Sequence, residues 1–348
     1  MKNKFIIKNT SGLSSANTEL IIDSSDNQKV CKSAIKDGVF DDCKNKLIDE
    51  LKWYQSLNVE AKSIFPEIKS YKITSRTVKI TMPYYFKGNT FENNYLKNNL
   101  SLANVVIFLD SLLNKLYLPT LNLDHPKRHL FLPFFLKEKL YNRKDKIKNI
   151  NFSVNLVINK KQIPSLDFLL KILIKSELFK KIKKETRLCK THGDLTFKNI
   201  LIDERDQNKF IFIDVNPKRF VRNYLSDPTE DISRILAYMY PILPIKQNAI
   251  NWEKITDNNY TLQEDSGIFL RHKKNFKHLF QNDFIYNLML KIYPDKKKLK
   301  IRVHFFWVIH VLTIALSRIV DGKNKNVFGF YLFAHRLLYL FLKKYKLT

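Results

Sequence analysis

The sequence contains few cysteines and few glycines. Of its 348 residues, three are Cys, seven are Gly and eleven are Pro. Cys31, Cys43 and Cys189 lie far apart and form no C-x-x-C pair, which excludes a disulfide scaffold and a cysteine-based zinc site. The low Gly and Pro content excludes collagen-like and linker-dominated chains. These absences predict a globular chain in a reducing compartment, and we expect it in the cytoplasm.

Long hydrophobic runs are also missing. The apolar stretch near the N-terminus, Phe5–Ile7, is too short for the apolar region of a signal peptide. The longest uncharged apolar stretch, Val303–Ser317, has fifteen residues and is closed by Arg318. A bilayer-spanning helix needs about 20 apolar residues. We therefore expect Val303–Ser317 to be a buried core helix, with His304 and His310 as core histidines.

Acidic residues are scarce relative to basic ones. Asp and Glu number 33 against 61 Lys and Arg, for a formal net charge of +28. Residues 1–90 hold 15 basic and 10 acidic side chains (+5), and residues 91–348 hold 46 and 23 (+23). No block of six or more like charges occurs, so a diffuse solvated surface is favoured over nucleic-acid binding. The run Lys296–Lys300 is expected to be a solvated loop, with peripheral contact to an anionic membrane or glycolipid as the alternative.

Hydrophobic residues make up 45% of the chain and aromatic residues 13%, enough to build packed cores and to exclude disorder. In the first ninety residues, Leu47, Leu51 and Tyr54 recur at i, i+4 and i+7, which predicts a helix over Asp41–Leu57. The expected strands are Phe5–Lys8, Thr18–Ile22, Lys29–Ala34, Ile64–Ile68 and Val78–Met82. This pattern predicts a small α+β unit that the chain leaves at Met82–Tyr85.

Beyond residue 90, helical periodicity dominates. The expected helices are Leu102–Leu118, Ser165–Lys181, Thr229–Tyr240, Phe276–Ile292, Ile301–Asp321 and Val327–Lys344. The polar stretches Asn142–Asn151 and Asn251–Ser266 are expected to be surface loops or insertions. The chain is therefore predicted to be an α+β protein with a small sheet lobe over residues 1–88 and a larger helical lobe over residues 89–348.

The strongest chemical signal is H-G-D-L-T-F-K-N-I-L-I over residues 192–202, followed by F-I-F-I-D over residues 210–214. Two short apolar strands joined by residues 203–209 predict a hairpin. This hairpin would bring Asp214 back beside Asp194 and Asn199. Carboxylate and amide oxygens suit phosphoryl transfer, in which the protein positions the reacting groups and holds Mg²⁺.

This motif, together with D-P-T-E-D-I-S-R over residues 227–234, resembles the aminoglycoside phosphotransferase and choline kinase-like family. The resemblance implies a bilobal protein-kinase-like fold that uses ATP and Mg²⁺. It implies that Asp194 is the catalytic base and that Asn199 and Asp214 are the Mg²⁺ ligands. Asp227 and Asp231 would lie in the segment beneath the catalytic loop, with Asp231 capping a helix there.

Such a fold needs a lysine on its third strand, aimed at the nucleotide phosphates and paired with a helix glutamate. Lys32 supplies the lysine, and Glu50 is the expected partner, with Asp49 as the fallback. Side chains alternate along a strand, so Val30 shares a face with Lys32 and is expected against the adenine.

Two further nucleotide contacts are expected from position in the chain. The small residues Ser11, Gly12 and Ser14 lie between the first two strands, where a loop covering the phosphates belongs. A plain hairpin turn is the alternative for this loop. Met82 and Tyr84 lie at the exit from the N-terminal unit, where a hinge would bind the adenine edge through its backbone.

These features predict an ATP- and Mg²⁺-dependent phosphotransferase acting on a hydroxyl of a small molecule or saccharide. Asp214 and Asp227 are only thirteen positions apart, too close for the activation segment of a protein kinase. The charge of +23 beyond residue 90 argues against a cationic acceptor and favours a neutral or anionic one, for which Lys218, Arg219 and Arg222 are candidate contacts.

The motif's likeness to kinases of capsule gene clusters favours a role in surface-polysaccharide biosynthesis. The alternatives are a catalytically silent kinase-like scaffold and a basic nucleic-acid-binding protein, although no nucleic-acid partner is expected. The sequence leaves the oligomeric state open.

Overall fold

The computed structural model describes residues 5–9, 17–22, 28–35, 41–97, 101–217, 224–264, 266–281, 283–321 and 327–348. The chain divides into two compact units: unit 1 is Met1–Thr120 with Lys190–Leu225, and unit 2 is Leu121–Cys189 with Ser226–Thr348. Residues 89–120 and 190–225, assigned to the helical lobe from sequence, thus group with the N-terminal residues. The boundary near residue 88 stays a prediction.

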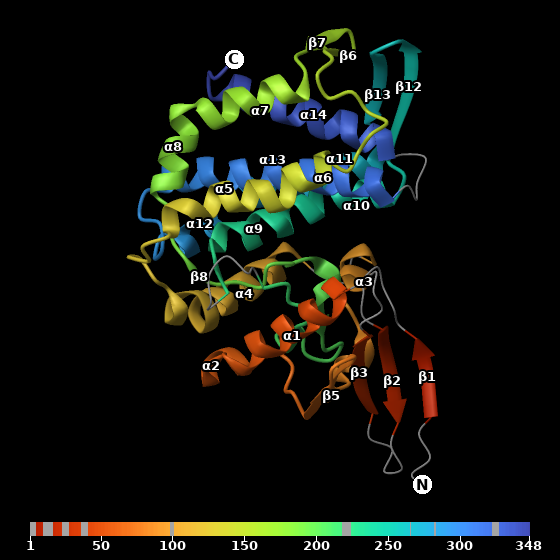
Figure 1. Ribbon diagram of the computed structural model, residues 1–348, viewed down its shortest axis with the longest axis vertical. Coiled ribbons are helices and arrows are strands. Elements are labelled where there is room, and N and C mark those ends of the chain that lie inside the picture. Colours follow the sequence, from red (N-terminus) through yellow and green to blue (C-terminus); the bar gives the residue numbers. More distant parts are fainter. Residues whose placement is uncertain are drawn as a thin grey trace. The chain divides into compact units, whose positions relative to one another are not determined.

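Unit 1 contains a five-stranded antiparallel sheet in the order β1-β2-β3-β5-β4. Figure 1 shows β1, β2 and β3 side by side. Its strands are β1 (Phe5–Asn9), β2 (Asn17–Ile22), β3 (Gln28–Ile35), β4 (Ser70–Ile73) and β5 (Thr77–Pro83). The long β3 pairs with β2 on one side and β5 on the other, with Val30 opposite Met82. The sheet confirms the predicted small sheet unit and is antiparallel, with β3 as its central strand.

Helix α1 (Asp41–Gln55) covers this sheet with the face predicted from its periodicity. Leu47 and Leu51 pack with Val78, Ile80 and Met82 in one buried cluster. Burial of apolar side chains is the main favourable contribution to folding, so this cluster fixes the helix against β3 and β5. The contact places Glu50, which lies three residues after Leu47 and directly before Leu51, on the side of α1 that faces the sheet.

One predicted strand is wrong. Residues Ile64–Ile68 form no strand, and β4 begins only at Ser70. Ile64 and Phe65 are buried as an irregular segment, and the Ile64 carbonyl accepts a hydrogen bond of 2.9 Å from the Phe212 N–H. Composition cannot distinguish a short apolar run in a strand from one in a buried loop, and for this reason the sequence predicted a strand here.

Among the residues that the structure describes, unit 1 also contains a two-stranded hairpin and several helices. The hairpin pairs β9 (Ile200–Ile202) with β10 (Phe210–Phe212), as predicted. The helices are α2 (Val59–Lys62), α3 (Phe91–Leu96) and α4 (Leu102–Leu112), with short helical turns η1 (Tyr85–Gly88), η2 (Leu113–Tyr117), η3 (Leu118–Thr120) and η6 (Phe197–Asn199). The predicted helix Leu102–Leu118 is therefore present but changes its hydrogen-bonding pattern at Leu113.

Unit 2 is mostly helical and has the long helix α13 (Lys296–Asp321) in its core. Its other helices are α5 (Phe131–Leu136), α6 (Asn142–Lys144), α7 (Leu166–Lys175), α8 (Glu177–Lys184), α9 (Pro228–Ala237), α10 (Leu243–Lys246), α11 (Ser266–Gln281), α12 (Asp283–Met289) and α14 (Val327–Lys344), with turns η4 (Arg128–Leu130), η5 (Lys137–Tyr141) and η7 (Tyr238–Ile242). Two-residue strands β8 (Cys189–Lys190) and β11 (Leu225–Ser226) lie where the chain passes from one unit to the other.

Helix α13 packs against α9 and α14 (Figure 1). By length and composition, Lys296–Val320 is the one described helix able to cross a membrane, yet 72% of its apolar window is buried within the protein. His310 is fully buried, and its Nε2 lies 3.1 Å from the Glu230 carbonyl oxygen. His304 is almost fully buried. The expected core helix and core histidines are confirmed. The Lys296–Lys300 run forms the first turn of α13 rather than a loop.

The helix expected over Phe276–Ile292 falls instead on the end of α11 and on α12, which ends at Met289, and two further predictions for unit 2 need correction. The helix expected over Ser165–Lys181 is two helices, because Ser176 is extended and its hydroxyl accepts from the Phe179 N–H at 3.1 Å. Residues Asn251–Ser266 are no loop: they contribute to the hairpin β12 (Ile250–Thr256) and β13 (Asn259–Glu264). This hairpin joins β6 (Leu156–Ile158) and β7 (Lys161–Ile163) in a four-stranded sheet.

Candidate active site

A buried ion pair links β3 to α1 in unit 1. The Lys32 Nζ lies 2.6 Å from the Glu50 Oε1, and both residues are less than one-tenth exposed. The same ammonium contacts the Asp214 Oδ1, so one cation serves two carboxylates. The expected pairing of Lys32 with Glu50 is present. Asp49, the fallback, instead accepts a hydrogen bond of 3.2 Å from the Tyr224 hydroxyl.

The pKa directions follow from this arrangement. Burial alone would lower the pKa of Lys32, but the charges of Asp214 and Glu50 raise it well above its usual value. Burial would raise the pKa of Asp214, yet the Lys32 ammonium, with a smaller contribution from Lys198, outweighs it and lowers that pKa. The pKa of Glu50 is raised by burial and by the Asp214 charge, against the effect of Lys32. With all three ionised, the cluster carries one excess negative charge.

The loop before β9 is held in shape by its own side chains. Gly193 has a φ of 73°, a left-handed conformation that glycine adopts readily. The Asn199 Nδ2 donates to the Asp194 carbonyl at 2.8 Å and reaches the Asp194 Oδ2 at 3.3 Å. Phe197 anchors the loop, with its ring 4.7 Å from that of Phe91. The loop therefore holds the Asp194 carboxylate and the Asn199 amide as one unit.

His192 is a candidate positioning residue to which the sequence assigned no role. It is fully buried, its Nδ1 accepts from the Asp194 N–H at 3.2 Å, and its Nε2 lies 2.8 Å from the Ile213 carbonyl. Because one ring nitrogen accepts, the other must carry the proton to bond the carbonyl. His192 is therefore neutral in this arrangement. It ties the loop of Asp194 to the residue before Asp214, and its place in the H-G-D tripeptide was the available signal.

A second bond joins the same two segments. The Ile213 N–H donates to the Asn199 carbonyl at 2.9 Å, directly before Asp214. Asp214 itself has a φ of 57°, a conformation that costs energy in a non-glycine residue and recurs at functional sites. The hairpin thus brings Asp214 back to the Asp194–Asn199 loop, as predicted.

The donor chemistry around Asp214 fits a magnesium ion. Mg²⁺ prefers hard oxygen ligands and is usually held by one or two protein groups together with substrate phosphates. Asn199 and Asp214 supply such groups on adjoining segments, and the excess negative charge of the Lys32 cluster would be relieved by a divalent cation. Among the described residues, no group of three or more His, Cys, Asp or Glu side chains forms a metal site. The metal roles of Asn199 and Asp214 stay predictions.

The expected hinge has an unusual backbone. The Tyr84 N–H donates to the Gln28 carbonyl at 3.2 Å, which continues the β3–β5 pairing past Met82. Phe86, Lys87 and Gly88 then follow with φ values of 46°, 50° and 70°. A Cβ on Gly88 would lie 2.9 Å from the Tyr84 hydroxyl, so that position accommodates only glycine without a shift.

The nucleotide-contact residues differ in how far the structure describes them. Val30 is half-buried on β3 and Met82 is buried in the core cluster of unit 1. Their adenine contacts, and that of Tyr84, stay predictions. Ser11, Gly12 and Ser14 lie outside the described residues, as do Lys218, Arg219 and Arg222.

In unit 2, the helix cap falls on a different residue from the one expected. Asp227, not Asp231, is the N-cap of α9, and its Oδ1 accepts from the Thr229 N–H at 2.9 Å. Its Oδ2 accepts from the Tyr293 hydroxyl at 2.8 Å and contacts the Arg302 guanidinium. Asp231 lies one turn along the helix. Pro228 at the first helical position fixes this start, because proline is favoured there.

No protein-family model matches the chain, and no curated protein matches it. Among solved structures, the chain is similar to a fructosamine-3-kinase-like protein of Thermobifida fusca, with 9% identity over 97% of this chain and 94% of that one, at a TM-score of 0.42. It is also similar to the aminoglycoside phosphotransferase APH(3'')-Id of Streptomyces rimosus.

That enzyme matches in two structures. In complex with ADP and streptomycin it has 12% identity over 85% of this chain and 94% of that one, at a TM-score of 0.39. In a second structure it has 10% identity over 87% and 92%, at 0.40. The structural neighbours thus include aminoglycoside phosphotransferases, the family that the sequence motif resembles.

Proposed function

We propose that the chain is an ATP- and Mg²⁺-dependent phosphotransferase that moves the γ-phosphoryl group to a hydroxyl of a small molecule or saccharide. One observation carries the proposal: the Lys32–Glu50–Asp214 cluster, assembled from β3, α1 and the end of the β9–β10 hairpin. The hairpin is bonded in turn to the loop of Asp194 and Asn199. All these residues belong to unit 1.

The chemistry assigns one task to each group. Lys32, oriented by Glu50, neutralises charge on the nucleotide phosphates. Asp194 accepts the proton of the acceptor hydroxyl as its oxygen bonds to the γ-phosphorus, and the bond from that phosphorus to the bridging oxygen breaks to release ADP. Asn199 and Asp214 would hold Mg²⁺, which when bound neutralises charge developing on the phosphate oxygens.

The acceptor is inferred from charge. Residues 91–348 hold 46 basic and 23 acidic side chains, and a positive field raises the local concentration of anions. A neutral or anionic acceptor, such as a sugar, a sugar phosphate or a surface-glycan precursor, suits this field better than a cationic one. We also propose a role in polysaccharide biosynthesis in the cytoplasm.

Release of ADP is the direct test. Purified protein is incubated with ATP, Mg²⁺ and a panel of sugars, sugar phosphates and amino alcohols, and ADP and phosphorylated product are measured. Asp194→Asn and Asp214→Asn should each lower the turnover by about a hundredfold or more, because each removes a group that acts in the transition state. Glu204→Gln, an exposed carboxylate in the loop joining β9 and β10, is the matched control.

The other outcomes separate the rivals. Nucleotide binding without turnover for any acceptor would favour a silent kinase-like scaffold. Tight, salt-dependent binding of RNA or DNA without nucleotide binding would favour a nucleic-acid-binding protein. Undiminished activity in both Asp variants would overturn the assignment of the site.

A further inference from the structure

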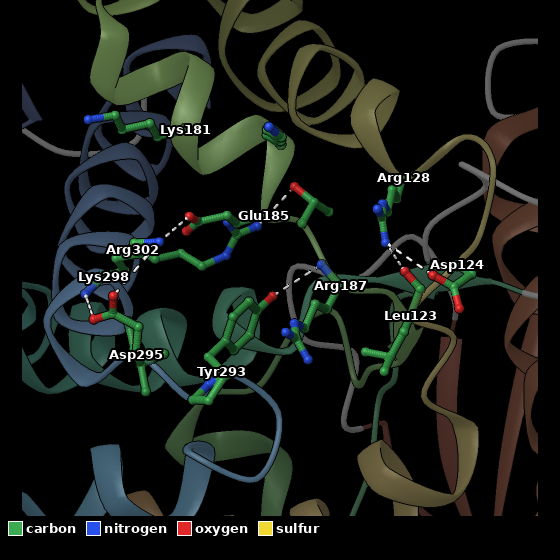
Figure 2. Close-up of a pocket in the computed structure, with 14 residues that line it drawn as sticks. Leu123, Asp124, Arg128, Lys181, Glu185, Arg187, Tyr293, Asp295, Lys298 and Arg302 are labelled. Carbon is green, nitrogen blue, oxygen red and sulfur yellow. Dashed lines mark hydrogen bonds and ion pairs between the residues drawn. The ribbon is translucent and has the colours of Figure 1, made fainter.

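Unit 2 contains a cavity of about 720 Å³ that the candidate active site does not use. It is built from the end of α8, the segment after it, the segment before α13 and the first turns of α13, with Leu123, Asp124 and Arg128 at one side (Figure 2). Every lining residue belongs to unit 2. The volume lies within the range of small-molecule sites, about 300–1,000 Å³.

The lining is rich in cations. Six of its fourteen residues are Lys or Arg and three are Asp or Glu. Each of these acids already has a cation beside it: Glu185 lies 2.8 Å and Asp295 3.8 Å from the Lys298 ammonium, and Asp124 lies 3.7 Å from Arg128. Arg302 is matched by the buried Asp227. The basic side chains of the lining therefore outnumber the acidic ones, and some of them have no carboxylate of the lining beside them.

Two of these cations, Lys184 and Arg187, have no carboxylate partner among the residues that the structure describes. Lys184 is exposed at the end of α8, and Arg187 is half-buried three residues later. Each is within a single concave surface, where low-dielectric walls strengthen the attraction for an anion. An arginine guanidinium is also well suited to bind a phosphate group through two hydrogen bonds.

Arg187 is held in position by an aromatic ring. Its guanidinium carbon lies 5.5 Å from the centre of the Tyr293 ring, and its backbone N–H donates to the Tyr293 hydroxyl at 3.3 Å. Figure 2 shows the guanidinium beside this ring. Tyr293 is fixed in turn by its hydroxyl bond to Asp227. The cation is therefore preorganised, which lowers the entropic cost of binding.

We propose that this cavity binds a phosphate-bearing small molecule, with Arg187 and Lys184 as the groups that bind its phosphate. The cavity is larger than a single phosphate ion requires, so the ligand carries an organic portion as well. Sugar phosphates and nucleotides share this chemistry. None of its lining residues is among the nucleotide-binding residues proposed for unit 1.

Titration calorimetry with inorganic phosphate, glucose 6-phosphate, glucose and AMP tests the proposal. The Lys32→Met background removes the main phosphate contact proposed in unit 1, so binding that persists there comes from another site. We expect the two organic phosphates to bind more tightly than inorganic phosphate, and glucose to bind more weakly than glucose 6-phosphate. The preference between glucose 6-phosphate and AMP distinguishes a sugar from a nucleoside portion.

Variants locate the binding. Arg187→Ala and Lys184→Ala should each weaken glucose 6-phosphate or AMP binding by about tenfold, as expected for loss of one charge-assisted contact. Lys183→Ala removes the same charge from the same end of α8 but does not line the cavity, and it should leave the affinity within about twofold. Lys184 is exposed, so its variant keeps the fold even where Arg187→Ala does not.

Hydrogen exchange gives a second readout. Bound ligand should slow exchange at residues 181–187 and 293–299. Equal loss of affinity in Lys183→Ala, unchanged affinity in both cavity variants, or no binding at millimolar concentrations in the Lys32→Met background would overturn the proposal.

Discussion

The Lys32 ammonium and the Glu50 carboxylate lie 2.6 Å apart and are almost completely buried. A buried charge is costly unless it is paired, so the two residues hold each other in place across β3 and α1. Asp214 competes for the same ammonium. The position of Lys32 is thus determined by two carboxylates that come from distant parts of the chain.

Replacing Glu50 should weaken the use of ATP without unfolding the protein. Glu50→Gln keeps the shape but removes the charge that orients Lys32, and Lys32 should then turn toward Asp214. We expect kcat/KM for ATP to fall by about ten- to a hundredfold, or roughly 1.4–2.7 kcal/mol in the transition state. Steady-state kinetics with varied ATP measure it. Asp49→Asn, on the same helix, is the control, and equal losses in both variants would contradict the role of Glu50.

Replacing His192 should lower kcat and leave the KM for ATP nearly unchanged, which tests whether His192 positions the Asp194 loop. His192→Phe keeps a ring but leaves the Asp194 N–H and the Ile213 carbonyl without their partner. We expect kcat to fall by about tenfold or more while the KM for ATP changes little, because the bonds hold the loop rather than the nucleotide. His192→Gln, which can bond both groups, should recover part of the activity. A rise in KM alone would argue against this positioning role.

The Asp227–Arg302 contact predicts a large effect on stability. Asp227→Asn leaves the buried Arg302 without its counter-ion, and removing one partner of a buried pair costs about 3–5 kcal/mol. Urea unfolding followed by circular dichroism measures the loss. Glu177→Gln breaks the exposed contact with Lys180 and should leave the midpoint of unfolding unchanged. A similarly small effect in both variants would show that water reaches Arg302.

Acid should destabilise unit 2 through its buried histidines. Burial lowers the pKa of His335 to about 4, and its Nε2 bonds the Pro164 carbonyl at 2.8 Å. The unfolded chain, with a histidine pKa of about 6.5, binds the proton more readily, so stability is greatest above that pH and falls as the pH drops toward 4. The slope should approach about 1.4 kcal/mol per pH unit for this group.

Unfolding by urea at pH 7.5, 6.0 and 5.0 measures this slope. His304 titrates in the same direction, with a pKa of about 3, and adds to it in the wild type. His335→Gln removes the His335 contribution and can still donate to the Pro164 carbonyl. An unchanged slope in that variant would contradict the prediction.

The sequence predicted best where a motif and a pattern agree. Residues 192–202 and 210–214 combine a distinctive motif spacing with two short apolar runs. Together these predicted the β9–β10 hairpin that the structure has. The face of α1 followed from Leu47 and Leu51, whose periodicity reflects the core they join. Glu50 was preferred to Asp49 as the partner of Lys32, and the structure has that pairing.

The sequence predicted less well where tertiary packing decides the outcome. Ile64 and Phe65 are as apolar as strand residues but pack as a loop, so composition misassigned them. Strand β12 is largely exposed, and β13 buries only Tyr260 and Leu262, so the polar composition of the hairpin concealed its short alternation. Its turn depends on Asn258 at a φ of 60°. The bonds of His192 and the sharing of Lys32 between two carboxylates involve residues distant in sequence, which spacing cannot reveal.

Unit 1 is discontinuous, because Leu121–Cys189 of the other unit comes between its two segments. On the ribosome, Lys32 and Glu50 are therefore made long before Asp214. At about 5–20 residues per second, roughly ten seconds or more separate them. During this time the nascent chain contains Lys32 and Glu50 but not yet Asp214. A message cut short before residue 214 would thus yield a chain that contains the Lys32–Glu50 pair but no Asp214 to complete the cluster.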